Sequence, residues 1–421
     1  MSKKNISFVG LGKLGLPLAT NFAKNGNRVV AIDKNDSLLK TLRQTKAPWI
    51  EDGLQENIES AKPFIKYTND YSQVANTDIS IILVNTPSVK KDGSFSNLYV
   101  EQSLESICQE LIKVGKSTHH FILSSTVMPR SIKDSFIPLI ESITGWSLSN
   151  GDFGFSYVPD FVAIGQIIRD FENPDFLLVG SSSDQYADEA EILYKTILQN
   201  DPNIAKLNLA EAELCKVSLN AYITTKISFA NYLGLLAAKV DPDINVDNVT
   251  GTIGMDKRIG GKYFKAGASY GGTCFPRDTW AFVKVSEKVG LKADQMFANE
   301  TINQATDTDI INRILESDPQ RVGLIGLGFK PGTSVVTEGL SEKLAKRLTR
   351  YNIDVHTHDL LDESYTNLIA SVGEDNLGEF HWSLDDLLNE VDVAVFCNNE
   401  SAYFINNIPS TTKIIDPWRI L

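Results

Sequence analysis

One cysteine lies in a stretch whose composition suits a nucleophile. Residues 267–279 read G-A-S-Y-G-G-T-C-F-P-R-D-T, so glycines and a proline surround Cys274. Gly271 has no Cβ, which allows the backbone to approach a ligand closely. Arg277 and Asp278 bring a cation and a possible base to this stretch, as a nucleophilic thiolate requires. The alternative is a buried cysteine that fills space as a small apolar side chain.

A long helix is predicted over residues 210–240, where the only glycine is Gly234 and there is no proline. Apolar residues recur there at helical spacing, as expected of a spine between two domains. Lys216 and Asn220 are four residues apart and therefore share one face of this helix. An ammonium group and an amide N–H can stabilise an oxyanion at a carbon under attack. The alternative for Lys216 is a solvated surface position.

The N-terminal residues follow the order of a dinucleotide-binding fold. An apolar run at 6–9, a glycine motif at 10–15, a helical pattern and a second apolar run ending in Asp33 succeed one another. In such a fold the first glycine makes the tight turn, the second admits the pyrophosphate and the third lets the helix pack on the strand. Asp33 can bind ribose hydroxyls and would repel a 2′-phosphate, which favours NAD over NADP. The predicted cofactor-binding residues are Gly10, Leu11, Gly12, Lys13, Leu14, Gly15 and Asp33.

Two further strands are predicted at 78–84 and 120–123, and each ends in a turn rich in hydroxyl groups. The turns contain Thr86 and Thr126, which would lie at the carboxyl ends of parallel strands, where ligands bind in open α/β sheets. The same hydroxyls could instead cap the following helices. Residues 170–180 are expected to return to a strand that closes this domain.

The last hundred residues repeat the alternation of strands and helices, beginning with a predicted strand at 321–325. The glycines that follow are spaced G-x-G-x-x-x-G, which argues against a second dinucleotide site. A mononucleotide diphosphate fits this spacing better, with Lys330 as a phosphate cation. His356 and His358 alternate on a predicted strand without further ligands nearby, so no metal site is predicted.

Composition and charge exclude several classes of protein. The chain has 421 residues, an apolar share of 42% and a formal net charge of −13. This balance suits two or three globular domains and argues against nucleic acid or an anionic membrane as partner. The four cysteines are widely spaced, with no C-x-x-C pair, as in a reduced cytoplasmic protein. We expect no signal peptide and no transmembrane helix.

The cysteine stretch closely resembles the loop G-x-G-Y-G-G-S-C-F-P-K-D of the UDP-glucose/GDP-mannose dehydrogenase family. The resemblance continues through A-E-x-x-K-x-x-x-N at 212–220, D-x-R-I-G at 256–260 and G-L-x-F-K-P at 326–331. It implies an α/β fold with two Rossmann-like parallel-sheet domains joined by a long central helix. The expected domains are 1–205 for binding NAD, 206–315 for dimerisation and the cysteine loop, and 316–421 for binding the nucleotide sugar through its UDP part.

The resemblance implies oxidation of a nucleotide sugar at C6 to the uronate, with two NAD reduced. Cys274 would form a thiohemiacetal and then a thioester, which water cleaves. The implied catalytic residues are Cys274, Lys216, Asn220, Asp278, Thr126 and Asp160. The implied substrate-binding residues are Phe161, Lys216, Asn220, Arg258, Tyr263, Gly271, Phe329 and Lys330. Thr86, Thr126 and Arg277 join the implied cofactor set. Arg258 would reach the substrate of a neighbouring subunit, which implies a homodimer.

The chain departs from the family pattern in three places. In P-D-F-V-A-I-G at 159–165, the first family carboxylate is shortened to Asp160 and the second is replaced by Ile164. An isoleucine cannot orient or deprotonate water, so Asp160, Asp278 or a water held by Thr126 takes this role in our interpretation. The usual proline-glycine turn is replaced at 128–130, and residues 333–339 lack the family's aspartates and arginine.

Two other functions remain open at this point. A single-oxidation dehydrogenase of the hydroxy-acid type would share the first domain but would not need Cys274. A catalytically silent nucleotide-sugar-binding protein would explain the departures, but would not need the catalytic residues. The sequence does not name the sugar; UDP-glucose or a UDP-N-acetylhexosamine is favoured because uridine is the commoner base in the family.

Overall fold

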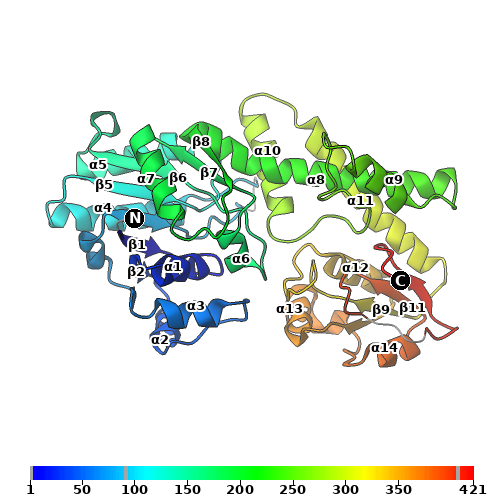
Figure 1. Ribbon diagram of the computed structural model, residues 1–421. Helices are drawn as coiled ribbons and strands as arrows, with labels where there is room; N and C mark the ends of the chain where they lie inside the picture. Colours follow the sequence, from blue (N-terminus) through cyan, green and yellow to red (C-terminus); the bar gives the residue numbers. More distant parts are fainter. Residues whose placement is uncertain (1–2, 90–92, 404–407) are drawn as a thin grey trace. The chain divides into compact units, whose positions relative to one another are not determined.

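The computed structural model describes residues 3–89, 93–403 and 408–421. The chain divides into two compact units, Met1–Val217 and Ser218–Leu421, each with its own sheet and flanking helices (Figure 1). The predicted α/β class with two Rossmann-like sheets is confirmed. The boundary between the units falls inside α8 (Leu209–Val240), the helix predicted over 210–240. The finer division into three domains stays a prediction.

The first unit contains an eight-stranded sheet in the order β3-β2-β1-β4-β5-β6-β7-β8. Its strands are β1 (Asn5–Val9), β2 (Arg28–Ile32), β3 (Ile65–Thr68), β4 (Ile79–Ile82), β5 (His119–Leu123), β6 (Phe153–Tyr157), β7 (Phe176–Ser181) and β8 (Asn203–Asn208). All neighbours are parallel except β6 and β7. The chain reverses direction across the sheet between β1 and β4, which is the point where ligands bind in such folds.

The strand predicted within 170–180 is present as β7 (Phe176–Ser181), but the prediction that it closes the first domain is wrong. β7 has β8 as a further parallel neighbour, and β8 forms the edge. The sequence N-I-A-K-L-N of β8 gives a weak signal because none of its residues is buried. An exposed edge strand of this kind lacks the continuous apolar run that marks a buried parallel strand.

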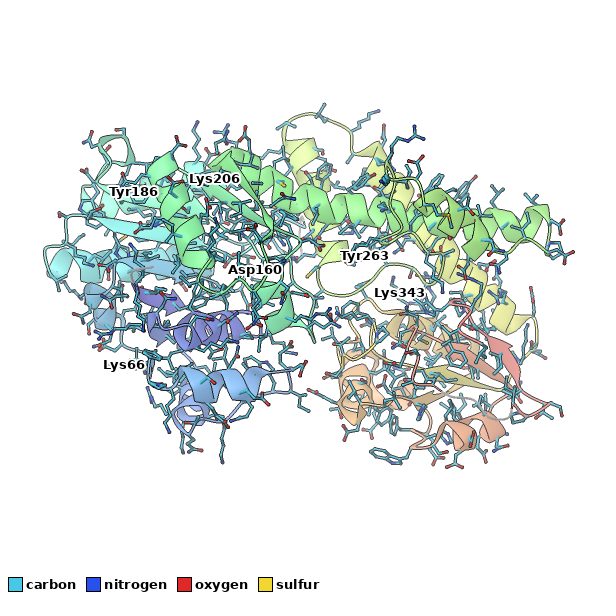
Figure 2. All side chains as sticks on the ribbon, viewed as in Figure 1. Lys66, Asp160, Tyr186, Lys206, Tyr263 and Lys343 are labelled. Atoms are coloured by element: carbon cyan, nitrogen blue, oxygen red, sulfur yellow. The ribbon has the colours of Figure 1, made fainter. Side chains whose placement is uncertain are left out.

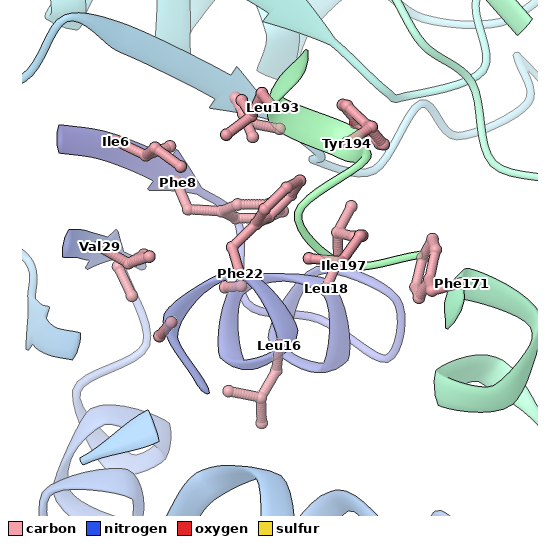
Figure 3. Packing of buried hydrophobic residues seen from close by; sticks show 14 of the residues in the cluster. Ile6, Phe8, Leu16, Leu18, Phe22, Val29, Phe171, Leu193, Tyr194 and Ile197 are labelled. Atoms are coloured by element: carbon pink, nitrogen blue, oxygen red, sulfur yellow. The ribbon is translucent and has the colours of Figure 1, made fainter. Parts of the chain in front are cut away.

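Helices cover both faces of the first sheet, and one of them holds the glycine motif. They are α1 (Gly15–Lys24), α2 (Asp36–Arg43), α3 (Leu54–Ala61), α4 (Leu98–Lys113), α5 (Ile137–Thr144), α6 (Ile167–Glu172) and α7 (Asp184–Tyr194). Phe22 of α1 shares a buried cluster with Ile6 and Phe8 of β1, and its ring meets Tyr194 edge-on at 5.3 Å (Figure 3). Full burial of such a side chain contributes about 1.5–3 kcal/mol. This packing fixes the turn between β1 and α1.

The second unit combines the rest of α8 with further helices and a four-stranded parallel sheet in the order β10-β9-β11-β12 (Figure 1). The strands are β9 (Arg321–Ile325), β10 (Asp354–His358), β11 (Val393–Phe396) and β12 (Lys413–Ile415). The helices are α9 (Val246–Gly254), α10 (Phe275–Lys288), α11 (Asp294–Leu315), α12 (Leu340–Leu348), α13 (Asp362–Val372) and α14 (Leu384–Glu390).

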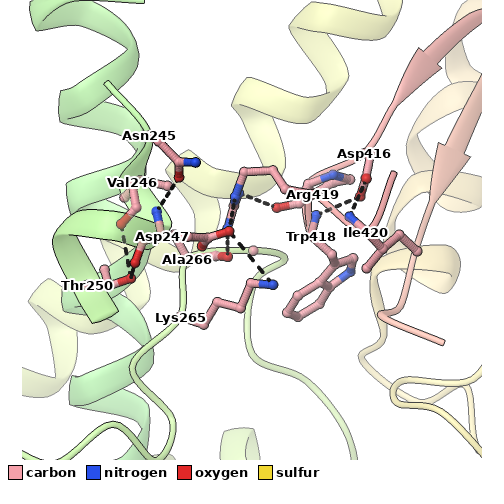
Figure 4. Close-up of polar contacts among 12 residues, drawn as sticks. Asn245, Val246, Asp247, Thr250, Lys265, Ala266, Asp416, Trp418, Arg419 and Ile420 are labelled. Atoms are coloured by element: carbon pink, nitrogen blue, oxygen red, sulfur yellow. Dashed lines mark hydrogen bonds and ion pairs between the residues drawn. The ribbon is translucent and has the colours of Figure 1, made fainter. Parts of the chain in front are cut away.

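The end of the chain is tied to the start of the cysteine loop (Figure 4). The guanidinium of Arg419 donates to both carboxylate oxygens of Asp247 on α9, at 2.9 and 2.8 Å, and also to the carbonyl of Ala266. A Cβ on Gly267 would lie 2.4 Å from the ring of Trp418, so only glycine fits there. The chain terminus therefore fixes where the cysteine loop begins.

Candidate active site

The three glycines of the N-terminal motif have different surroundings. Gly10 has a φ of +98°, and a Cβ there would lie 2.3 Å from the carbonyl of Leu83. A Cβ on Gly15 would lie 2.0 Å from the carbonyl of Gly10, so this glycine is needed for the close turn into α1. A Cβ on Gly12 would meet no atom within 4 Å. The open face at Gly12 is the one that a pyrophosphate can approach, which fits a bound dinucleotide.

Asp33 follows β2 and is held beside the glycine motif. Its Oδ2 accepts the N–H of Leu11 at 2.7 Å, and its Oδ1 accepts the N–H of Asn35 at 2.8 Å. Each carboxylate oxygen has a further lone pair with which it can accept from a ribose hydroxyl. The arrangement fits NAD, and the negative charge disfavours a 2′-phosphate.

The two hydroxyl-bearing turns meet at the ends of β4 and β5. The hydroxyl of Thr86 donates to the carbonyl of Thr126 at 2.6 Å. The hydroxyl of Ser125 donates to the carbonyl of Val84 at 2.7 Å and accepts its N–H at 2.9 Å. These hydroxyls link two neighbouring strand ends rather than cap helices, and they fix the switch-point edge of the sheet.

The turn after Thr126 is held by α8. Arg130 has a φ of +77°, the left-handed region that favours glycine, and it stands in the proline-glycine turn of the resembling family. The buried carboxylate of Glu213 accepts the N–H groups of Arg130 at 2.8 Å and Ile132 at 2.9 Å. Burial raises the pKa of Glu213 to about 7, although both backbone N–H groups act in the opposite direction. Glu213 thus shapes a turn at the predicted cofactor side.

Asp160, Phe161 and Lys216 form one group in the first unit. Lys216 is only 6% exposed; its Nζ donates to the carbonyl of Asp160 and lies 4.3 Å from the ring centroid of Phe161. The alternative of a solvated position for Lys216 is therefore wrong. The Oδ2 of Asp160 is buried and has no hydrogen-bond partner within the described part of the chain. Burial raises the pKa of Asp160 to about 7, which the charge of Lys216 partly offsets. Such a carboxyl can gain or lose a proton near neutral pH.

A carboxylate that sequence reasoning missed holds the loop after Phe161. Glu51 is largely buried, and its oxygens accept the N–H groups of Gly165 at 3.1 Å and Ile167 at 2.8 Å. Ile167 begins α6, and a negative charge is favourable at a helix N-terminus. Glu51 therefore holds the backbone of the loop on the C-terminal side of Ile164. Its partners lie 114 and 116 residues away, so no local pattern pointed to it.

Cys274 directly precedes α10, and its side chain is exposed. The alternative of a buried, space-filling thiol is therefore wrong. The hydroxyl of Thr273 lies 3.6 Å from Sγ. One turn further, the carboxylate of Asp278 is 1% exposed; its Oδ2 accepts from Asn220 Nδ2 at 2.6 Å and its Oδ1 from Arg277 Nε at 3.2 Å. The structure thus brings Asn220 and Arg277 to the carboxylate of Asp278, which follows Cys274 by four residues in the chain.

Two buried asparagines that sequence reasoning missed hold the backbone of the cysteine loop. Asn231 of α8 accepts the N–H of Gly267 at 2.8 Å and donates to the carbonyl of Ala268 at 2.9 Å. Asn303 of α11 accepts the N–H of Tyr270 at 2.7 Å and donates to its carbonyl at 3.2 Å. One signal was available, because Asn231 follows Asn220 by three helical turns and lies on the same face.

The glycine pair of the cysteine loop lies against the last sheet's loops. A Cβ on Gly271 would lie 1.9 Å from the carbonyl of Glu338, and one on Gly272 would lie 2.6 Å from the ring of Phe329. These glycines therefore allow the loop to pack closely against another segment of the same chain rather than against a ligand. Nζ of Lys330 lies 5.9 Å from the centroid of the Phe329 ring.

Arg258 and Tyr263 are exposed on the segment between α9 and the cysteine loop. The guanidinium of Arg258 is paired with Asp256, with Nη2 2.5 Å from Oδ2. Tyr263 has a φ of +59°, and its ring meets Phe275 edge-on at 6.0 Å (Figure 2). Both side chains are accessible to a ligand or a partner.

The second glycine loop differs from the first at the position that matters for phosphate. Asp359 accepts the N–H of Leu327 at 2.5 Å, as Asp33 does in the first unit. However, a Cβ on Gly328 would lie 2.0 Å from the carbonyl of Thr333, so the chain occupies the face that Gly12 leaves open. The same fold is present twice, but within the described residues only the first loop leaves this face free for the pyrophosphate of a dinucleotide.

The histidines of the last sheet are engaged in hydrogen bonds. Nδ1 of His356 lies 2.8 Å from Nε2 of His381, and its Nε2 lies 3.1 Å from a carboxylate oxygen of Asp354. Nδ1 of His358 lies 2.8 Å from the carbonyl of His381. Across residues 3–89, 93–403 and 408–421, no group of three or more side chains has the arrangement of a metal site.

The sheet order, the open glycine turn and the acid after β2 define an NAD-dependent oxidoreductase with a Rossmann-type domain. Residues 4–198 match the NAD binding domain of the UDP-glucose/GDP-mannose dehydrogenase family, and residues 210–305 match its central domain. The chain belongs to this family of NAD-dependent nucleotide-sugar 6-dehydrogenases, and NAD is its cofactor.

Relatives and solved structures agree with this assignment. The chain is 31% identical to UDP-glucose 6-dehydrogenase AglM of Haloferax volcanii, over 84% of this chain and 83% of the relative. It is 27% identical to GDP-mannose 6-dehydrogenase of Pseudomonas aeruginosa, over 98% and 95% of the two chains. The structure of a UDP-glucose dehydrogenase from Pyrobaculum islandicum superposes with a TM-score of 0.90 at 28% identity, covering 100% of this chain and 95% of that one. No helix within the described residues is long and apolar enough to cross a membrane.

Proposed function

We propose that the protein oxidises C6 of a UDP-sugar, UDP-glucose or a UDP-N-acetylhexosamine, to the uronate, with two NAD reduced per sugar. The exposed thiol of Cys274, one turn before the buried Asn220–Asp278 pair, is the observation that carries this proposal. Oxidation of an alcohol to an aldehyde needs no thiol, whereas a thioester route from aldehyde to acid does. Uridine is favoured because the relatives from H. volcanii and P. islandicum are UDP-glucose dehydrogenases.

Gly12, Asp33, Thr86 and Thr126 are the residues that we expect to hold NAD, together with the rest of the glycine motif. When bound, NAD supplies the hydride acceptor for both oxidations. The open face of Gly12 admits the pyrophosphate, and Asp33 accepts from the ribose hydroxyls. The linked turns of Thr86 and Thr126 form the edge on which the nicotinamide side is expected.

Cys274 carries the covalent step in this proposal. Its thiolate adds to the carbon of the aldehyde; a C–S bond forms, and the carbonyl oxygen takes up a proton to give a thiohemiacetal. Lys216 and Asn220 stabilise the negative charge that develops on that oxygen. The second oxidation leaves a thioester on Cys274.

Asp160 is the proposed base for cleavage of the thioester. Its carboxylate takes a proton from water while the water oxygen attacks the thioester carbon; the C–S bond breaks and the thiolate of Cys274 leaves. The buried Oδ2 of Asp160 supports this role, because it keeps its acceptor capacity. The side chain of Ile164 cannot act as a base. Asp278, four residues after Cys274, is assigned to orienting the thiol.

The proposed substrate contacts divide into sugar and nucleotide. Phe161, Lys216 and Asn220 are assigned to the sugar, together with Tyr263 and Gly271. Phe329 and Lys330, on the second glycine loop, are assigned to the diphosphate and base, because an ammonium group beside an aromatic ring suits a nucleotide diphosphate.

We also propose that a second copy of the chain covers an exposed apolar stripe on α8. The stripe consists of Tyr222, Phe229, Tyr232, Leu236 and Val240, which are between 42% and 66% exposed. Their spacings of seven, three, four and four residues place them on one face of the helix. A continuous apolar face of this length is typical of an interface between subunits.

The dimer and the role of Arg258 can be tested together. Phe229→Glu should shift the protein towards monomer in light scattering after size-exclusion chromatography. Co-expression of Arg258→Ala and Cys274→Ala chains should restore activity that each parent lacks, if Arg258 acts in the neighbouring subunit. An absence of restoration in verified mixed dimers would place Arg258 in its own subunit's site.

The decisive experiment for the reaction is stoichiometry. Purified protein is incubated with NAD and a panel of UDP- and GDP-sugars, and NADH is counted per sugar consumed. Two NADH per uronate on a UDP-sugar is the expected result, and it is lost in Cys274→Ala. One NADH per sugar in steady turnover would indicate a single-oxidation dehydrogenase. Tight sugar-nucleotide binding without NADH would indicate a silent binder.

A further inference from the structure

The cysteine loop has a first part that the surrounding helices hold firmly. Asn231 and Asn303 each bind an N–H and a carbonyl of its backbone, at distances between 2.7 and 3.2 Å. Nζ of Lys343 on α12 donates to the hydroxyl of Ser269 at 3.0 Å and to the carbonyl of Tyr270 at 3.2 Å (Figure 2). The backbone is thus fixed from Gly267 to Tyr270.

The second part of the loop, Gly271 to Thr273, leads directly to Cys274 and rests on a different element. The N–H of Gly272 donates to the carbonyl of Thr337 at 3.0 Å. The absent Cβ of Gly271 leaves room for the carbonyl of Glu338, which would lie 1.9 Å from such an atom. Both contacts come from residues that precede α12. The last residues before the thiol are therefore positioned by this short segment.

The conformation of Glu338 decides where these two carbonyls point. Glu338 has a φ of +54° although it is not glycine, and its side chain is exposed. Its N–H donates to Oε2 of Glu342 at 2.5 Å, and Glu342 is itself buried and paired with Lys346 at 2.6 Å. Burial acts to raise the pKa of Glu342, but the hydrogen bonds from Lys346, Ser371 and the Glu338 N–H together lower it, so this support stays charged.

The same segment is joined to the proposed nucleotide residues. The N–H of Phe329 donates to the carbonyl of Val335 at 2.8 Å. The ring of Phe329 fills the side of Gly272 where a Cβ would lie 2.6 Å away. A Cβ on Gly339 would lie 3.2 Å from the Cα of Phe329. Phe329, the segment 335–339 and the glycine pair thus form one packed unit.

We propose that Glu338 is a positioning residue for Cys274: its left-handed backbone places the carbonyls of Thr337 and Glu338 against the glycine pair and so fixes the thiol. The nucleotide arm of this inference rests on the proposed function, in which Phe329 binds the nucleotide. A nucleotide bound at Phe329 then changes the position of Cys274 through the segment 335–339, which contacts both Phe329 and the glycine pair. The exposed carboxylate of Glu338 is not required, because the contacts are made by the backbone.

The test uses the alkylation rate of Cys274 in the full-length protein without ligand, followed by mass spectrometry of the tryptic peptide 266–277. Glu338→Val places a β-branched residue, for which a positive φ is strongly disfavoured, at this position and so displaces the two carbonyls; we expect the rate to change by about threefold or more. Glu338→Ala removes only the exposed carboxylate and keeps a side chain at the left-handed position, so its rate should stay within about twofold of the wild type. Equal rates in all three proteins would overturn the proposal.

A second pair of variants approaches the same contact from the other side. Gly271→Ala must displace the carbonyl of Glu338 and should also change the alkylation rate, whereas Gly251→Ala on α9, where a Cβ meets nothing within 4 Å, should not. In turnover, Glu338→Val should lower kcat by about tenfold with KM within about twofold, because the thiol is misplaced while binding is kept. A raised KM with unchanged kcat would overturn the positioning role.

The nucleotide arm separates this inference from the proposed function. UDP or GDP alone should slow alkylation of Cys274 in the wild type and in Glu338→Ala, but not in Glu338→Val at equal saturation. Equal protection in all three proteins would mean simple shielding by the nucleotide and would overturn the coupling. A rate difference between the unliganded variants without any nucleotide effect would uphold the positioning of Cys274 and remove Phe329 from the proposed nucleotide site.

Discussion

The amide of Asn220 donates to Oδ2 of Asp278 at 2.6 Å, one helical turn after the exposed thiol of Cys274. The other carboxylate oxygen of Asp278 accepts from Arg277 Nε at 3.2 Å. The carboxylate is therefore buried, and two hydrogen-bond donors compensate for its loss of contact with water. This pair joins the long helix to the first turn of α10.

Asp278→Asn tests whether that charge serves the reaction. The substitution keeps the shape and can keep a hydrogen bond from Asn220, so the thermal midpoint should change little. We expect kcat to fall by about 100-fold, as for loss of a group that moves or orients a proton. Steady-state kinetics with NAD and the UDP-sugar measure this effect.

Asn220→Ala is the matched control on the structural side. It leaves Asp278 without its shortest hydrogen bond, so the free energy of unfolding should fall by about 1–3 kcal/mol. Wild-type kcat in Asp278→Asn, with loss of stability confined to Asn220→Ala, would show that the pair is structural only.

Gly12→Ala and Gly15→Ala should separate cofactor binding from folding. A Cβ on Gly12 meets no atom within 4 Å, so the thermal midpoint should be unchanged while the Kd for NAD rises by about tenfold or more. A Cβ on Gly15 would lie 2.0 Å from the carbonyl of Gly10 and should lower the thermal midpoint itself. Calorimetric titration with NAD and thermal unfolding measure both quantities. Unchanged NAD affinity in Gly12→Ala would contradict the assignment of the open face.

The sequence predicted the parts of the site that are written in local spacing. The glycine turn, Asp33 and the helix over 210–240 each follow from residues close together in the chain, because a helix or a strand–turn–helix unit is set by near neighbours. The composition of residues 267–279 singled out Cys274 and Asp278, the family pattern implied their roles, and the structure shows that Asn220 meets Asp278.

The sequence could not predict supports that come from far along the chain. Glu51 binds a loop more than a hundred residues away, and Asn303 reaches back 33 residues to Tyr270. Buried polar side chains such as these satisfy backbone groups of irregular loops, and their partners depend on tertiary packing. The edge strand β8 was missed for a related reason, since its exposed residues carry no apolar pattern.

Arg130→Gly should stabilise the protein. A left-handed backbone costs a residue other than glycine about 1–2 kcal/mol, and glycine removes this strain. Part of the resulting gain in stability is lost because glycine makes the unfolded chain more disordered. Both variants lose the exposed ion pair with Asp134 at 2.7 Å, but Arg130→Ala also keeps the strain, so it should be less stable than the wild type. Urea denaturation of the three proteins measures the order. A glycine variant less stable than the alanine variant would contradict strain at this turn.

The ionisation of Asp160 should set the acid limb of activity. Burial raises the pKa of this carboxyl to about 7, so the ionised base is present only above that pH. The rate of the hydrolytic step should therefore rise with pH between about 6 and 8, and Asp160→Asn should abolish most of the rate and its pH dependence. Single-turnover uronate formation across this range measures the limb. Glu213, whose pKa is raised to a similar value, provides the control, because Glu213→Gln should keep the limb.

The raised pKa of Asp160 also makes the free energy of unfolding depend on pH. The folded state binds the proton of Asp160 more tightly than the unfolded chain, where an aspartate has a pKa of about 3.9. The stabilising contribution of the protonated group is therefore complete below about pH 4 and is lost as pH rises towards about 7. Asp160→Asn should reduce this fall in the free energy of unfolding, and Glu213→Gln in the same chain should reduce it further. An undiminished slope in Asp160→Asn would mean that burial does not raise the pKa of Asp160, and the acid limb of activity would then belong to another group.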